Sequence, residues 1–183
     1  MASGARMMAR LALAGLCLCT LGYSRCTFVS DTGGTVGGGG TIGGGSYTTT
    51  LILRDSTGAP ATSFVFGESI RFDLEIQNNA NQPATLTFPD GQIYDFYVLE
   101  PTVNRVRWRW SDGMNFTQMT TSISFASYGS KAYSIVWSGV LGNGTQLPVG
   151  SYRARGVIVA GNFNNDPLMS SDLGSNIVNF TVR

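Results

Sequence analysis

The chain has 183 residues, with no histidine and only three cysteines. The absence of histidine excludes Ser-His-Asp and Cys-His catalysis and histidine-ligated zinc. Twelve basic against eleven acidic residues give no charge excess for nucleic acid, so the composition favours a binding or structural module that is not an enzyme and uses no cofactor or metal.

Residues 1–26 have the pattern of a signal peptide. Arg6 and Arg10 form a short basic region, and an uncharged, mostly apolar run follows at residues 11–22. This run matches the apolar region of a signal peptide and is too short to cross a hydrocarbon core of about 30 Å as a helix. The segment therefore predicts export, to the cell envelope as a membrane-anchored lipoprotein or outside the cell as a secreted protein.

Two kinds of processing fit this leader. Gly22 and Ser24 supply the small residues that a secretory cleavage site needs. Alternatively, Cys26 becomes the lipidated first residue, as in a bacterial lipoprotein, and the protein contacts a membrane only through that anchor. All three cysteines lie in the leader, so the rest of the chain must fold without a disulfide.

Residues 27–46 are predicted to be a flexible linker, because glycine dominates their second half. Ordering glycine carries the largest backbone entropy loss, and few side chains here could offset it by burial. Residues 47–183 are predicted to form one domain. The leader holds three of the twelve basic residues, so nine basic and eleven acidic residues remain, with a net charge of −2.

The domain is predicted to consist of eight or nine strands. Alternation is clearest at residues 69–77, where every second residue is apolar and those between are polar, as in a strand with one buried face. The pattern predicts an all-β fold, an antiparallel β-sandwich, with a small closed barrel as the alternative. The predicted strands are residues 48–54, 69–77, 82–88, 93–99, 105–110, 116–125, 132–137, 151–160 and 177–182.

One predicted strand carries a row of three arginines. Arg105, Arg107 and Arg109 share one face by the two-residue period of a strand. A contact with an anionic partner is one interpretation. We favour a solvated outer face whose long side-chain stems cover apolar surface, because the net charge of the domain is negative.

Four signatures follow one another along the domain. They are Phe-Gly-Glu at residues 66–68, Phe-Pro-Asp-Gly-Gln-Ile-Tyr-Asp-Phe at 88–96, Trp-Ser-Asp-Gly-Met-Asn-Phe-Thr-Gln at 110–118, and Trp137 followed by Pro-Val-Gly-Ser-Tyr at 148–152. With these signatures the domain resembles the BsuPI family, named after an intracellular proteinase inhibitor of Bacillus. The resemblance implies an immunoglobulin-like sandwich and inhibition of a proteinase.

The signature residues are interpreted mainly as scaffold. Large aromatic side chains supply much of the burial energy of a sandwich. Asp95, which lies between two aromatic residues, is predicted to hydrogen-bond nearby backbone or an arginine. The aromatic residues predicted to lie in the core are Phe66, Phe72, Phe88, Trp110, Phe116, Trp137 and Tyr152.

The longest irregular stretch, residues 161–174, provides the predicted contact site. Leu168 and Met169 are apolar side chains in a polar loop, and Pro167 before them can preset an extended backbone and lower the entropy lost on binding. We predict that Leu168 or Met169 fills the primary pocket of a proteinase. The alternative is that both residues cap the sandwich, and the loop at residues 141–147 is a rival contact site.

The sequence therefore predicts a non-catalytic binding protein, an exported inhibitor of a subtilisin-like serine proteinase. The alternative function is a cell-envelope interaction or adhesion module with an immunoglobulin-like fold and no inhibitory activity.

Overall fold

The computed structural model describes residues 47–103, 105–160 and 173–183, and this part of the chain contains ten strands and no helix. It accordingly contains no helix that could span a membrane. The strands are β1 (Tyr47–Arg54), β2 (Ser63–Phe64), β3 (Ile70–Asn78), β4 (Ala84–Phe88), β5 (Tyr94–Leu99), β6 (Val106–Arg109), β7 (Thr121–Phe125), β8 (Ser130–Trp137), β9 (Gly150–Ile158) and β10 (Val178–Val182).

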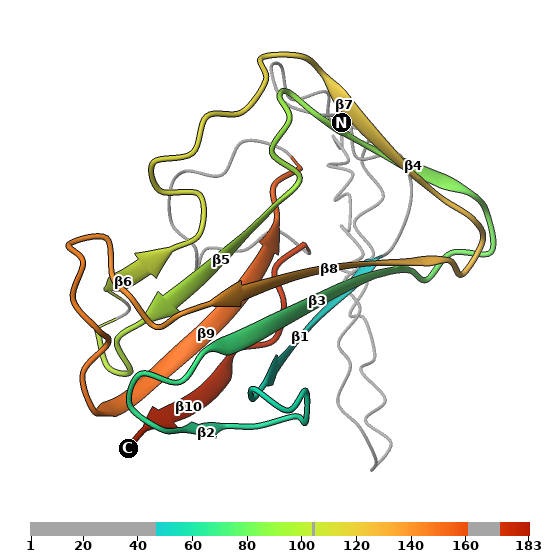
Figure 1. Cartoon of the computed structure of the whole chain (residues 1–183). Helices are drawn as coiled ribbons and strands as arrows, with labels where there is room; N and C mark the ends of the chain where they lie inside the picture. The colour runs from blue at the N-terminus through green and yellow to red at the C-terminus, as the bar shows by residue number, and fades with distance from the viewer. Residues whose placement is uncertain (1–46, 104, 161–172) are drawn as a thin grey trace, which may run out of the picture. The chain divides into compact units, whose positions relative to one another are not determined.

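The strands form two packed layers and a ribbon (Figure 1). One sheet has the order β1-β3-β8, and the other has the order β2-β10-β9-β5-β6. All pairings are antiparallel except that of β2 with β10. The predicted all-β sandwich is confirmed, and nine of the ten strands overlap predicted ones. The sequence pattern missed only β2, whose two residues are too few to show a period.

The ribbon of β4 and β7 prolongs the paired strands β3 and β8 beyond a bend. Asn78, fully buried, holds this bend. Its amide nitrogen donates hydrogen bonds to the carbonyl oxygens of Gln82 (2.8 Å) and Ala126 (3.0 Å), and its amide oxygen accepts one from the Ala80 backbone N–H (3.0 Å). A short polar side chain is needed here because the bending backbones leave groups that no ladder pairs.

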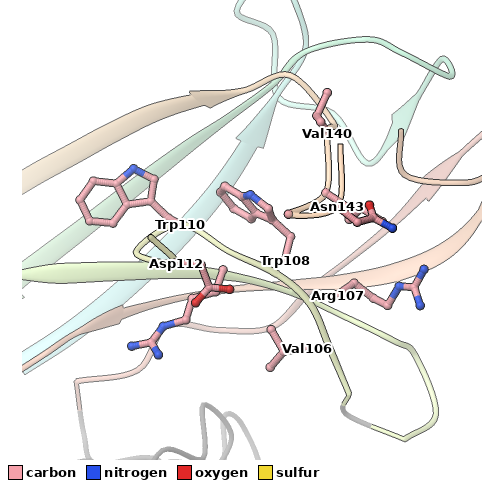
Figure 2. A pocket seen from close by; sticks show the side chains of 10 residues that line it. Val106, Arg107, Trp108, Trp110, Asp112, Val140 and Asn143 are labelled. Atoms are coloured by element: carbon pink, nitrogen blue, oxygen red, sulfur yellow. The ribbon is translucent and has the colours of Figure 1, made fainter. Parts of the chain in front are cut away.

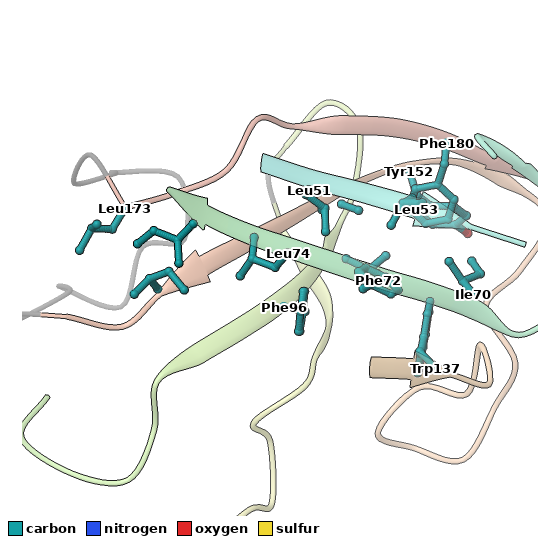
Figure 3. Packing of buried hydrophobic residues seen from close by; sticks show 14 of the residues in the cluster. Leu51, Leu53, Ile70, Phe72, Leu74, Phe96, Trp137, Tyr152, Leu173 and Phe180 are labelled. Atoms are coloured by element: carbon teal, nitrogen blue, oxygen red, sulfur yellow. The ribbon is translucent and has the colours of Figure 1, made fainter. Parts of the chain in front are cut away.

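The core fills the space between the two sheets. Along β3 every second residue is buried, as the alternation predicts. Phe72 of β3 meets Phe96 of β5 edge to face, with ring centroids 5.6 Å apart. Figure 3 shows the residues that meet between the layers, among them Leu51, Leu53, Ile70, Phe72, Leu74, Phe96, Tyr152 and Phe180.

The predicted aromatic core is largely confirmed, with one error. Of the seven aromatic residues, Phe72, Phe88, Trp137 and Tyr152 are buried. Trp110 and Phe116 are half-buried and stack loosely on each other. Phe66 is 52% exposed, so its assignment to the core is wrong. The reason is that β2 ends at Phe64 and a turn follows, which breaks the alternation that would have pointed Phe66 inward.

Close approach of the two sheets depends on Gly156 of β9. A Cβ atom at this position would lie 2.5 Å from Cδ1 of Leu74, which is fully buried on β3 of the facing sheet.

We expect Gly156→Ala to lower the free energy of unfolding by about 1–3 kcal/mol, because the packed core cannot move aside without strain. Urea unfolding followed by tryptophan fluorescence measures the change. Gly142→Ala is the control, since its Cβ would enter open space; equal stability of the two variants would contradict this account.

Asp73 ties the three strands of the smaller sheet together on its outer face. Its carboxylate accepts hydrogen bonds from Arg54 Nε (2.6 Å), Arg71 Nε (2.7 Å) and Ser134 Oγ (2.6 Å). Partial burial alone would raise the pKa of Asp73, but the bonds from Ser134, Arg71 and Arg54 outweigh it and hold the pKa below 3.8. The ionised form is therefore favoured by folding.

This lowered pKa gives a pH dependence of known sign. Stability supplied by ionised Asp73 is fully present above its unfolded pKa and is lost as the pH falls below 3.8 through the folded pKa. Asp73→Asn should therefore lower stability at neutral pH and flatten its decline in acid. Thermal unfolding between neutral pH and strong acid tests this, with Glu75→Gln on the same strand as control for the lost charge. Parallel pH profiles for Asp73→Asn and the wild type would contradict the prediction.

Candidate functional site

The predicted contact residues Leu168 and Met169, and the predicted lipidation residue Cys26, lie outside the described residues. They stay predictions. The residues that flank the loop are described: Ile158 donates its backbone N–H to the Leu173 carbonyl oxygen (3.0 Å) at the far end of β9 from Gly150. The residues that flank the loop therefore lie at one end of the sandwich, and the rival loop at residues 141–147 lies at the other.

Three connections meet at that other end, on the lower left of Figure 1. They join β2 to β3, β5 to β6, and β8 to β9. Strands β2, β5 and β8 all end here, and β3, β6 and β9 begin here, so their loops are brought together by the topology and not by sequence. Loops held at one end of a sandwich are a common position for binding residues.

The β8–β9 connection, which contains the rival loop, is fixed by its own backbone. Leu141 donates its N–H to the Thr145 carbonyl oxygen (2.8 Å), and Leu147 donates to Gly139 (2.8 Å). The Asn143 side-chain oxygen accepts from both the N–H (3.1 Å) and the hydroxyl (2.7 Å) of Thr145. These bonds give a preformed loop that would lose little entropy on binding.

A groove of about 510 Å³ lies between this loop and β6 (Figure 2). Trp108 lines it and stacks on Trp137, with ring centroids 4.6 Å apart. The Trp137 indole N–H donates to the Val140 carbonyl oxygen (2.8 Å), so Trp137, which stacks behind the lining residue Trp108, also positions the loop. The other labelled residues of the groove are Val106, Arg107, Trp110, Asp112, Val140 and Asn143.

Strand β6 forms the open edge of the larger sheet. Its register with β5 shifts by one residue, so that Arg107 is an extra residue between the pairs Val106–Leu99 and Trp108–Val98. Such a bulge disturbs the edge and prevents unwanted strand pairing. The groove therefore has an irregular edge strand on one side and a fixed loop on the other.

The arginine row on β6 is neutralised by carboxylates. Glu100 accepts from Arg105 (2.7 Å) and from Arg107 (3.3 Å). Arg109 pairs with Asp95 at 2.6 Å. Arg105 is exposed, and Arg107 and Arg109 are half-buried. The three arginines are thus held in ion pairs with carboxylates on β5 or directly after it. Arg107 and Arg109 are less exposed than the solvated face that we favoured from the sequence.

Asp95 is fully buried and joins two of the signature segments. One carboxylate oxygen accepts from Arg109 Nε (2.6 Å) and from Ser111 Oγ (2.7 Å), and the other accepts from the backbone N–H of Phe96 (2.9 Å) and of Ser111 (3.2 Å). The prediction that Asp95 bonds nearby backbone or an arginine is confirmed, since it bonds both. Burial alone would lower the pKa of Arg109, but the bond to Asp95 outweighs it and raises that pKa.

Beside this pair, Arg109 lies 5.4 Å above the ring of Tyr97. Burial, together with the negative charge of Asp95, raises the pKa of the Tyr97 hydroxyl well above its usual value. Tyr97 therefore remains neutral at any physiological pH. The arrangement fixes the start of the 110–118 segment.

The groove presents Trp108 and Trp110 beside polar side chains that are largely paired. Among the described residues, no three acidic side chains come close enough to hold a metal ion. The polar groups that line the groove are mainly held in ion pairs and turn hydrogen bonds. What the site offers to a partner is surface shape and half-buried aromatic area on a fixed backbone.

Comparison with known proteins identifies the class. The family described as "BsuPI: Intracellular proteinase inhibitor" matches residues 61–163. The match covers more than half of the chain and spans β2 to β9, so the chain belongs to this family of inhibitor domains. No curated protein matches the sequence.

The family description corrects one prediction. Its members are described as intracellular, which contradicts the predicted exported or cell-envelope location. That prediction depended on the apolar leader at residues 1–26, which lies outside the residues that the family matches.

Solved structures resemble the domain only distantly. An alkylpurine DNA glycosylase from Pseudomonas fluorescens has 8% identity and a TM-score of 0.44, over 76% of this chain and 31% of that one. A β-glucosidase from Erythrobacter marinus has 8% identity and a TM-score of 0.42, over 76% and 16%. A CARDB domain from Pyrococcus furiosus has 9% identity and a TM-score of 0.37, over 75% and 89%. The chain thus spans less than a third of the glycosylase, and no functional argument follows.

Removing the Asp95 charge should destabilise the fold. Asp95→Asn leaves the Arg109 guanidinium without its counter-charge, and breaking a buried pair costs about 3–5 kcal/mol. Because 35% of the Arg109 side chain is exposed, we expect a loss near the lower end, about 3 kcal/mol. Urea unfolding measures it. Glu100→Gln, which breaks a more exposed pair, should cost less than about 1 kcal/mol; a larger loss for Glu100→Gln than for Asp95→Asn would refute this ranking.

Proposed function

We propose that this protein is a non-catalytic inhibitor of a subtilisin-like serine proteinase and that it acts by occupying the substrate cleft of the enzyme. The observation that carries the proposal is the match of the inhibitor family over residues 61–163. The resemblance of the four signatures to the Bacillus inhibitor family supports the subtilisin-like class.

The construction of the domain suits an inhibitor. A proteinase cleaves segments that unfold or can be drawn into an extended form. Here the loops at one end are closed by internal hydrogen bonds, and the strands beneath them are tied to a buried aromatic core. A fixed backbone lowers the entropy lost on binding and resists digestion at the same time.

The fold achieves this without a disulfide, because the sequence has no cysteine after Cys26. Its resistance must therefore come from burial and hydrogen bonding. Burial of large aromatic residues such as Phe72 and Phe96 is the main favourable term. An inhibitor of this kind stays folded in a reducing compartment, where disulfides are rare.

Titration of the purified full chain against subtilisin tests the proposal. We expect stoichiometric loss of activity on a chromogenic peptide substrate, with the inhibitor intact by mass spectrometry. A cysteine proteinase of the papain class serves as the control for the serine preference. Rapid digestion of the chain, with no loss of subtilisin activity, would refute inhibition of this class; inhibition of the cysteine proteinase alone would refute the serine preference.

A further inference from the structure

The turn between β2 and β3 presents two apolar side chains to solvent. Val65 is 57% exposed and Phe66 is 52% exposed, directly after Phe64, which is buried. Phe64 packs edge to face on Phe180, with ring centroids 5.9 Å apart. Phe64 thus anchors the turn in the core, and Phe66 is exposed on its surface.

The backbone of this turn is fixed from both sides. Glu68 donates its N–H to the Val65 carbonyl oxygen (2.9 Å), and its carboxylate accepts from the Val65 N–H (2.8 Å). Phe66 donates its N–H to the Arg183 carbonyl oxygen (2.8 Å). Gly67 has a φ of +80°, which the third residue of a type II turn requires and which glycine adopts without strain.

A third apolar residue belongs to the same surface. Val182 of β10 pairs with Phe64 of β2 on one side and with Gly150 of β9 on the other. Val65 follows Phe64 and Val149 precedes Gly150, so at strand spacings of about 4.8 Å these two valines lie on either side of Arg183. Val149 is 64% exposed. Val65 and Phe66 after β2 and Val149 before β9 therefore flank Arg183, which is exposed, at the end of three adjacent strands.

We propose that Phe66 is the anchor residue that fills an apolar pocket in the substrate cleft of the proteinase, with Val65 and Val149 packed on the rim of that pocket. The inference rests on the proposed function, because the inhibitor family makes a proteinase the partner. The shape also favours this occupant. Enzyme clefts are concave and largely apolar, and an exposed aromatic side chain on a turn with a fixed backbone complements them. Aromatic anchors in such pockets are typical interface hot spots.

The turn does not present a cleavable bond. A substrate lies extended in a proteinase cleft, whereas the backbone from Val65 to Glu68 reverses direction within four residues. The Phe66–Gly67 peptide bond is therefore held out of the extended form that the enzyme attacks. We expect the bound inhibitor to remain uncut at this bond, unlike an inhibitor that imitates a substrate.

The experiment compares full-chain variants as inhibitors of subtilisin. Phe66→Ala should raise the inhibition constant at least tenfold, because the pocket loses the ring that fills it. Phe66→Tyr keeps the ring and should stay within about threefold of the wild type. Met119→Ala truncates another large apolar side chain, 73% exposed and outside the β2–β3 turn, so it is the control and should leave inhibition unchanged. Thermal unfolding checks that each variant is folded.

A Leu168→Gly/Met169→Gly double variant separates this inference from the loop predicted by sequence. If Phe66→Ala inhibits subtilisin as strongly as the wild type does, the inference is overturned and the proposed function still stands. Loss of inhibition in the double variant would then assign the contact to the loop. A cut between Phe66 and Gly67 in the complex also overturns it, because the turn would then act as a substrate. Absence of inhibition by the wild-type chain instead refutes the proposed function itself.

Discussion

Contact of Phe72 with three other aromatic rings is the interaction on which the rest of this domain depends. Phe72, fully buried on β3, meets Phe96 of the facing sheet and also the rings of Trp108 and Trp137. The first contact holds the two layers together. The other two fix the edge strand β6 and the end of β8, and Trp137 passes that constraint to the β8–β9 loop through its bond to Val140. The geometry of the β8–β9 loop therefore depends on the packing of the aromatic core.

The buried carboxylate of Asp95 links two segments of the larger sheet by polar bonds, as Phe72 links the sheets by apolar contacts. It joins the segment of β5 to the segment that follows β6, which are separated in sequence by the β5–β6 connection. Two of the signatures that mark the family thus meet at the hydrogen bonds that Ser111 donates to Asp95, and these residues belong to the scaffold. A signature can therefore identify the class of protein through residues that hold the scaffold together. Phe66 and Val149 differ from these scaffold residues, because both belong to signatures and are exposed at the surface.

The sequence predicted the strands well because alternation of apolar residues is a local property. Ile70, Phe72, Leu74 and Ile76 are buried as their two-residue period requires. The same reasoning could not find β2, since two residues have no period, and it misplaced Phe66, because the turn after β2 depends on bonds to Glu68 and Arg183. The sequence predicted that Asp95 would bond backbone or an arginine, but it did not identify Arg109 as that arginine. Which three loops would share one end of the sandwich is set by strand order, which the sequence pattern does not contain.

An inhibitor must use its backbone hydrogen-bonding groups either internally or to bind the enzyme, and this choice accounts for an apolar turn at the surface. A loop that is to resist a proteinase has to commit its backbone donors internally, and the N–H groups of Val65, Phe66 and Glu68 are all used in this way. A backbone so committed has few donors and acceptors left to pair with the enzyme as a substrate does. Affinity must then come from side chains, and burial of an aromatic ring is the largest contribution a single side chain makes without a charge. A fixed turn with an exposed phenylalanine satisfies both requirements, whereas a flexible loop with the same residue would satisfy only the second.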